Sequence, residues 1–376
     1  MNWRLALFTG AAAASLAQAA CSEPPPGAQA DRPAATKAAA TQAAAPVAPP
    51  APAPVVASTS PQAQAVDAAT FLAAPAPGAA AADPEAQKRM LIRAQVLLDR
   101  AHFSPGVIDG QAGENVRQAI AAFEQARGLP VDGQLDEQVW AALTAADAQP
   151  ALQDYEITGE DVAGPFAQAI PTDVADMAKL QKLSYTSPAE LLAEKFHMDE
   201  RLLKALNPNV DFSKAGAKIV VAAVADRSLP AKVARIEVDK AEREVRAYAA
   251  DETLLAVYPA TVGSSDRPAP AGEWEVRTIA PNPTWTFDPT RLTFGKEKKK
   301  LTIAAGPNNP VGVMWIDLTK DTYGIHGTPD PAKVGKAESH GCVRLTNWDV
   351  RQLGAAVQKG TKVVFMGAEG SAGKKT

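Results

Sequence analysis

The hydrophobic pattern of this chain changes its period near residue 230, and this change constrains the fold more than any other feature. Before it, apolar residues recur at helical spacing, as at Val116, Ile120 and Phe123. After it, apolar and polar residues alternate, as in Arg235-Ile-Glu-Val-Asp239 and Glu244-Val-Arg-Ala-Tyr248. A helical stretch followed by a run of strands predicts separate domains, and 376 residues leave room for two or three.

The first 20 residues have the organisation of an export signal. Arg4 precedes the short apolar stretch Leu5–Leu16, and Ala17-Gln-Ala19 is a small-x-small cleavage site. A competing interpretation makes Cys21 the acylated residue of a lipoprotein, although Gln18 stands where a lipobox normally has an aliphatic residue. Both interpretations predict an exported, periplasmic protein, and the second adds a membrane anchor at Cys21. No later apolar stretch reaches 18 residues, which excludes a multi-spanning membrane protein.

Residues 21–85 are dominated by alanine and proline, as in the run from Ala44 to Pro54. Such a stretch has too few large apolar groups to offset the entropy lost on ordering. We therefore expect an extended, disordered tether with polyproline II character.

Residues 86–146 form the first unit expected to fold. Val139, Trp140 and Leu143 share one helical face, Asp136 is placed to cap that helix, and two Asp-Gly turns divide the unit. We expect a linker over 147–180 and a small α/β segment over 181–224. In that segment one helix follows Ser187, a second spans about 199–206, and a strand covers 218–222.

The last domain is expected over 231–368 and is mainly β. Beyond the first strands, the alternation predicts strands at 254–258, 272–277, 313–318 and 362–365, with one helix near 350–358. Residues 369–376 are expected to be a disordered tail. The net charge of −4 offers no electrostatic basis for nucleic-acid binding.

Cys342 is the candidate nucleophile of the last domain. The chain has two cysteines, and an unpaired thiol in an oxidising compartment invites oxidation unless it is used. His340 and His326 lie close in sequence, and an imidazole can take the thiol proton and later protonate a leaving amine. The peptide N–H groups around Gly341 and Cys342 are candidate donors to an oxyanion.

Two other interpretations of this cluster compete with cysteine catalysis. Cys342, His340 and His326 could be three zinc ligands, but His-x-Cys without a second cysteine is unusual for a structural zinc site. A buried cysteine between two satisfied histidines would place two of the chain's four histidines there by chance. We therefore expect cysteine catalysis with no metal and no cofactor.

The C-terminal motifs resemble the signature of the YkuD-type L,D-transpeptidases over about residues 232–366. The resemblance rests on two runs separated by twelve residues, Tyr323-Gly-Ile-His-Gly-Thr328 and Ser339-His-Gly-Cys-Val-Arg-Leu345. Weaker matches are Thr261-Val-Gly263, Ala269-Pro-Ala-Gly272, Gly306-Pro-Asn-Asn-Pro-Val-Gly312 and Gly360-Thr-Lys-Val-Val364.

The resemblance implies roles for single residues. Cys342 would be the nucleophile and His326 the general base, with the Gly327 carbonyl selecting its tautomer. Arg344 would pair with a substrate carboxylate or tie the loop to a buried carboxylate. The remaining residues implied are His340 and Ser339 as support, and Tyr323 as a pocket wall.

Two further resemblances point to the same substrate. Residues 86–146 resemble a three-helix peptidoglycan-binding domain, and residues 181–224 resemble a degenerate LysM module. Peptidoglycan is thus the expected partner, with a stem tetrapeptide as substrate, and the acyl acceptor is either another stem or a wall-anchored lipoprotein. Two other functions stay open: an L,D-carboxypeptidase on the same stems, and a non-catalytic wall-binding tether.

Overall fold

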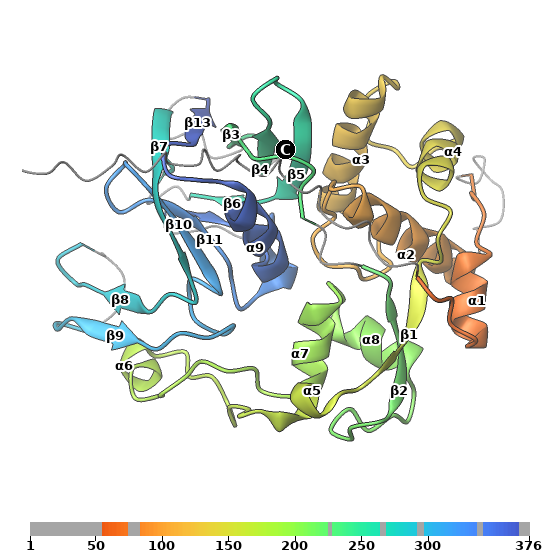
Figure 1. The fold of residues 1–376 in the computed structure, drawn as a ribbon, viewed down its shortest axis with the longest axis horizontal. Helices are drawn as coiled ribbons and strands as arrows, with labels where there is room; N and C mark the ends of the chain where they lie inside the picture. The colour runs from red at the N-terminus through yellow and green to blue at the C-terminus, as the bar shows by residue number, and fades with distance from the viewer. Residues whose placement is uncertain are drawn as a thin grey trace, which may run out of the picture. The chain divides into compact units, whose positions relative to one another are not determined.

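The computed structural model describes residues 55–73, 83–224, 228–263, 268–291, 297–336 and 341–367 (Figure 1). The expected signal peptide, Cys21 and the tail over 369–376 lie outside these residues. Among the helices of the described ranges, none combines the length and the apolar character needed to cross a membrane.

Helix α1 (Pro61–Asp67) lies inside the stretch that the sequence predicts to be a disordered tether. Ala63 and Val66 are buried in it, and Asp67 Oδ1 accepts hydrogen bonds from the backbone N–H groups of Ala151 (2.7 Å) and Leu152 (3.4 Å). The prediction is thus wrong for this part of the stretch. Composition alone misses such a helix, because small side chains are enough when another segment supplies the surface to pack against.

Three helices form the first folded unit, as predicted. They are α2 (Pro84–Arg100), α3 (Glu114–Arg127) and α4 (Glu137–Ala146). Asp136 caps α4 by accepting a hydrogen bond from Val139 N at 2.8 Å. Leu98, Phe123 and Leu143 are fully buried between the helices.

The next unit contains a strand that the sequence analysis missed. Strand β1 (Leu152–Glu156) pairs antiparallel with β2 (Lys218–Ala222), so the expected linker over 147–180 supplies one of the two strands. Its sequence, Leu-Gln-Asp-Tyr-Glu, is mostly polar, and only Leu152 is buried, so the strand depends on its backbone pairing with the apolar β2. The unit also contains α5 (Gly159–Ala163), α6 (Val174–Met177), α7 (Pro188–Lys195) and α8 (Glu200–Leu206).

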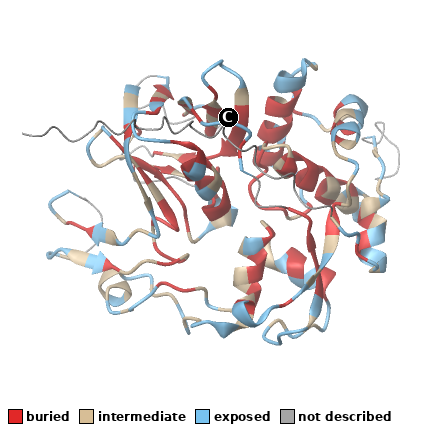
Figure 2. Cartoon of the chain, in the orientation of Figure 1, coloured by how far each residue is buried: buried red, intermediate tan, exposed pale blue. Residues whose placement is uncertain are grey.

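Nine of the described strands form one mixed sheet in the order β5-β4-β3-β13-β7-β10-β11-β12-β6. Helix α9 (Asn347–Ala356) packs against β10 and β11, and Figure 2 shows the inner strands of the sheet largely buried. The helix begins three residues before its predicted start, because Thr346 caps it by accepting a hydrogen bond from Asp349 N at 3.1 Å. The strands are β3 (Arg235–Asp239), β4 (Glu244–Tyr248), β5 (Leu254–Pro259), β6 (Thr261–Val262), β7 (Gly272–Pro281), β10 (Met314–Leu318), β11 (Gly324–His326), β12 (Val343–Arg344) and β13 (Lys362–Met366).

Two short elements interrupt the sheet domain. The hairpin of β8 (Trp285–Phe287) and β9 (Leu301–Ile303) is inserted between β7 and β10, and the 3-10 helix η1 (Pro331–Lys333) follows β11. Phe287 and Ile303 are buried against Leu183. The hairpin therefore packs on the segment that leads into α7.

Candidate active site

Parallel pairing of β11 with β12 brings the two sequence motifs together. Ile325 lies opposite Val343 and His326 opposite Arg344, and Leu345 N donates to His326 O at 2.9 Å. Cys342 directly precedes β12, on the same strand pair that carries His326. Parallel strands separated by a crossover can hold residues far apart in sequence at one edge of a sheet.

Cys342 is a partly exposed thiol that follows a turn only glycine adopts readily. Gly341 has φ of +105°, outside the range that residues with a Cβ readily adopt. The Cys342 Sγ atom lies 3.6 Å from Thr322 O. The sulfur is therefore held at the edge of the sheet and is still accessible to a substrate.

His326 is buried and is held as a neutral base. Its Nδ1 lies 2.7 Å from Gly327 O, and a carbonyl oxygen can only accept, so Nδ1 carries the proton and Nε2 keeps a lone pair. Burial lowers the pKa of His326 to about 3, and the positive charge of Arg344 adds to this shift. The ring stacks on Trp315, with centroids 5.3 Å apart. The implied role of the Gly327 carbonyl thus agrees with the geometry.

Arg344 brings a positive charge to the site. Burial lowers its pKa, while the sulfur of Cys342 and the carboxylate of Asp330 act in the opposite direction. Within the described ranges its buried Nε has no hydrogen-bond partner, and no ion pair joins Arg344 to a carboxylate. The role of Arg344, toward a substrate carboxylate or toward a carboxylate of the protein, stays a prediction.

Of the other predicted site residues named here, the structure describes only Tyr323. Ser339 and His340 lie outside the described residues. Tyr323 donates a hydrogen bond from its hydroxyl to Pro268 O at 3.2 Å, which connects the start of β11 to the chain before β7.

Sequence reasoning missed Asn347, the first residue of α9. Its side chain contacts both Gly312 and Gly327, and it accepts a hydrogen bond from Val313 N at 3.2 Å. Gly312 and Gly327 were the available signal, because a glycine is often required where a side chain from elsewhere approaches the backbone closely.

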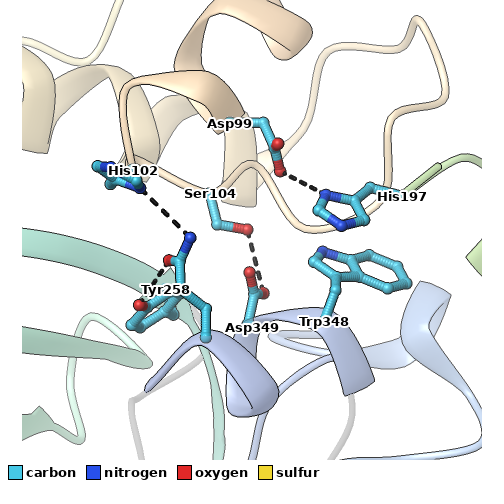
Figure 3. Close-up of a pocket in the computed structure, with 8 residues that line it drawn as sticks. Asp99, His102, Ser104, His197, Tyr258, Trp348 and Asp349 are labelled. Atoms are coloured by element: carbon cyan, nitrogen blue, oxygen red, sulfur yellow. Dashed lines mark hydrogen bonds and ion pairs between the residues drawn. The ribbon is translucent and has the colours of Figure 1, made fainter. Parts of the chain in front are cut away.

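A second polar pocket is lined by none of the predicted site residues (Figure 3). In it His197 Nδ1 lies 3.0 Å from Asp99 Oδ1, and the imidazole stacks on Trp348 with centroids 4.9 Å apart. Ser104 Oγ donates to Asp349 Oδ2 at 3.1 Å. The complete lining is Asp99, His102, Ser104, His197, Tyr258, Trp348, Asp349 and Gln352.

A thiol that directly precedes the strand paired with that of a neutral imidazole, with a guanidinium opposite the imidazole, is the arrangement that cysteine-dependent acyl transfer requires. Comparisons with known proteins specify the family. The L,D-transpeptidase catalytic domain (YkuD) matches residues 233–365, and a domain described as "Putative peptidoglycan binding domain" matches residues 90–143. These spans agree with the resemblances noted in the sequence.

Relatives of known sequence agree with this match. The "Putative L,D-transpeptidase YkuD" of Bacillus licheniformis is 31% identical over 176 residues, covering 46% of this chain and 90% of that protein. The "Probable L,D-transpeptidase ErfK/SrfK" of Escherichia coli is 32% identical over 187 residues, covering 47% of this chain and 59% of that one. The crystal structure of L,D-transpeptidase 3 from Mycobacterium tuberculosis aligns with a TM-score of 0.31 and 15% identity, over 36% of this chain and 62% of that chain, a likeness too partial to add to the assignment. The chain belongs to the YkuD-type family of cysteine-dependent L,D-transpeptidases.

Proposed function

We propose that the protein acts on peptidoglycan stem tetrapeptides and transfers the acyl group of the third stem residue to an amine. The product would be a 3-3 cross-link between stems or, with a lysine as acceptor, a lipoprotein attached to the wall. The observation that carries the proposal is the hydrogen bond from His326 Nδ1 to Gly327 O beside the strand of Cys342. It leaves Nε2 as the basic atom of a buried, neutral imidazole.

The first step forms a thioester. His326 Nε2 takes the proton from Cys342, and the sulfur attacks the carbonyl carbon of the third residue, which the family resemblance implies is meso-diaminopimelate. Backbone N–H groups around Gly341 and Cys342 would donate to the oxyanion. The C–N bond then breaks, and the His326 imidazolium gives its proton to the departing amine of D-alanine.

The second step resolves the thioester. His326, again neutral, takes a proton from the acceptor amine as its nitrogen attacks the acyl carbon, and the C–S bond breaks. The sulfur leaves as thiolate and recovers that proton. With water as the acceptor the same steps would release a tripeptide, which is the carboxypeptidase alternative.

Arg344 would receive a carboxylate of the substrate. Its guanidinium has a buried Nε without a partner in the described ranges, and a carboxylate can accept two parallel N–H bonds from it. The same charge disfavours a resting imidazolium at His326. His326 would therefore act as a base during the reaction rather than rest as an ion pair.

The helical unit of α2, α3 and α4 would hold the enzyme on the wall. Its match to a peptidoglycan-binding domain supports this role. The expected export signal supports a periplasmic location, where the substrate lies. Binding of glycan by the LysM-like segment stays a prediction.

Incubation of the protein with disaccharide-tetrapeptides, with products identified by mass spectrometry, tests the proposal. We expect a dimer accompanied by free D-alanine, and no turnover by Cys342→Ala although this variant still sediments with sacculi. A tripeptide monomer in place of the dimer would indicate a carboxypeptidase. Unchanged substrate together with retained sacculus binding would leave only a wall-binding tether.

A further inference from the structure

The side-chain amide of Asn347 is fixed on both of its sides. Its Nδ2 donates to Glu194 Oε2 at 2.9 Å and to Pro307 O at 3.2 Å, and its Oδ1 accepts from Val313 N at 3.2 Å. Two acceptors face the nitrogen and a donor faces the oxygen, so only one orientation of the amide satisfies every partner.

The oxygen of this amide lies against the peptide that holds the catalytic base. A Cβ added to Gly312 or to Gly327 would overlap Asn347 Oδ1, so both glycines are needed where the amide approaches the backbone. Gly327 is the residue whose carbonyl accepts the Nδ1 proton of His326. Asn347 is therefore one contact away from the group that selects the tautomer of the base.

Glu194 reaches this amide from α7, in the LysM-like segment. Its other oxygen accepts a hydrogen bond from the Tyr185 hydroxyl at 2.6 Å, and burial raises the pKa of Glu194 while these two hydrogen bonds lower it. A carboxylate oxygen accepts and does not donate, so it holds the nitrogen rather than the oxygen of the Asn347 amide. The contact joins residues 153 positions apart in the chain.

We propose that Asn347 is a positioning residue for His326 and that Glu194 sets the orientation of its amide. The inference rests on the proposed function only in taking His326 as the base. It gives the LysM-like segment a part in catalysis that does not depend on glycan binding. A loss at Glu194 would act through Asn347 and Gly327 on the imidazole and would leave substrate contacts unchanged.

The same helix offers a matched control. Glu190 lies one turn before Glu194 on α7 and accepts a hydrogen bond from Asn308 Nδ2 at 2.7 Å, so it also joins the helix to the catalytic domain through an asparagine. It accepts a further hydrogen bond from Thr186 N at 2.6 Å near the start of the helix. Glu190→Leu removes a hydrogen bond of the same type between α7 and an asparagine of the catalytic domain, but Glu190 makes no hydrogen bond to Asn347.

The test compares Glu194→Leu, Glu194→Gln and Glu190→Leu in the full chain. We expect Glu194→Leu to lower kcat about 10- to 100-fold with KM nearly unchanged, because a displaced base loses alignment with the thiol. Glu194→Gln should restore most of kcat, since its amide oxygen can accept from Asn347. Glu190→Leu should stay within about threefold of the wild type, because it leaves the base aligned. Melting temperatures of the three variants report on folding.

Two measurements need no substrate and so separate this inference from the proposed function. ¹⁵N chemical shifts of His326 report its tautomer, and we expect the Nδ1–H form to lose population in Glu194→Leu alone. The rate at which iodoacetamide alkylates Cys342, measured across pH by mass spectrometry of the peptide, should change its pH dependence in the same variant. Equal losses of kcat in the two Leu variants, or an unchanged tautomer in Glu194→Leu, would show that the contact between Glu194 and Asn347 contributes only to packing. If the wild type turns over no tetrapeptide, the proposed function fails, and these two measurements still decide the role of Asn347.

Discussion

Two histidines of this molecule share a stacking contact with a tryptophan and differ in the oxygen that faces Nδ1. His326 and His197 each stack on a tryptophan, Trp315 and Trp348, and each has its Nδ1 at hydrogen-bond distance from an oxygen. At His326 that oxygen is a backbone carbonyl, whereas at His197 it is the carboxylate of Asp99 (Figure 3). A carboxylate stabilises a protonated ring through its charge, whereas at His326 burial and the positive charge of Arg344 lower the pKa despite the hydrogen bond to the carbonyl.

This difference would distinguish His326, proposed as the catalytic base, from His197, which has a structural role. At His326 the neutral ring keeps Nε2 basic, beside a thiol and a guanidinium. At His197 the ring joins the loop after α7 to α2, and its neighbours Trp348 and Asp349 belong to α9. The comparison predicts that substitutions at His326 change turnover, whereas substitutions in the pocket around His197 change stability.

The largest expected effect is on turnover. His326→Gln should lower kcat by about 10²- to 10⁴-fold, because general-base catalysis at the thiol is lost. The matched change His197→Gln should leave kcat within about threefold, since this ring does not reach the reacting atoms. Steady-state assays of D-alanine release on tetrapeptide measure both. Similar losses in the two variants would contradict the distinction drawn between them.

The next largest effect is expected from moving the peptide whose carbonyl accepts the Nδ1 proton of His326. Gly327→Ala keeps the carbonyl but places a Cβ against Asn347 Oδ1, so the peptide that holds His326 must move. We expect kcat to fall about 10- to 100-fold, as misplacement of a catalytic group does elsewhere. Gly159→Ala is the control, because a Cβ there meets open space and its φ is not positive. An active Gly327→Ala enzyme would show that the position of this peptide is unimportant.

The sequence indicated most of the proposed reacting groups but few of the residues that position them. Cys342, His326 and Gly327 lie within short motifs, so their chemistry follows from local spacing. Asn347 and Glu194 could not be found in this way, because their contact depends on how α7 packs beside α9. The sequence showed the glycines that this contact requires but not the side chain that approaches them.

The same limit explains the errors in the fold. Helix α1 and strand β1 carry few large apolar side chains, and they are held by contacts with partners elsewhere in the chain. The strands β3 and β4 were predicted because their alternation contains the signal within five residues. Local patterns thus identified the elements with a strong apolar face, and elements that depend on tertiary contacts were missed.

A smaller effect concerns stability in acid. The folded-state pKa of His326 is about 3, below its ordinary value of 6.5. The stability that depends on the neutral ring is therefore fully present above about pH 6.5 and is lost as the pH falls toward 3. We expect the melting temperature of the wild type to fall more steeply over this range than that of His326→Gln. Parallel curves from calorimetry would mean that the ring is less buried than the structure indicates.

The smallest expected effect has the opposite dependence on pH and comes from the pocket around His197. Burial raises the pKa of Asp349 to about 7, and the nearby carboxylate of Asp99 adds to this shift. The folded state holds this proton after the unfolded chain has lost it near pH 3.8, so wild-type stability declines as the pH rises from about 4 to 7.

Asp349→Asn removes that decline and keeps an oxygen that can accept the hydrogen bond from Ser104. We expect its melting temperature to exceed that of the wild type by about 2–4 °C at pH 8, the shift that roughly 1 kcal/mol produces in a domain of this size. The difference should vanish near pH 4, where both chains are neutral at this position, and kcat should not change at either pH. A variant that is less stable at pH 8 would show that the Asp349 carboxylate is stabilised by His197 more strongly than it is destabilised by burial. The Asp349 carboxylate of α9 would then form a stabilising ion pair with His197 in the loop after α7. This would increase the contrast with His326, whose ring is neutral.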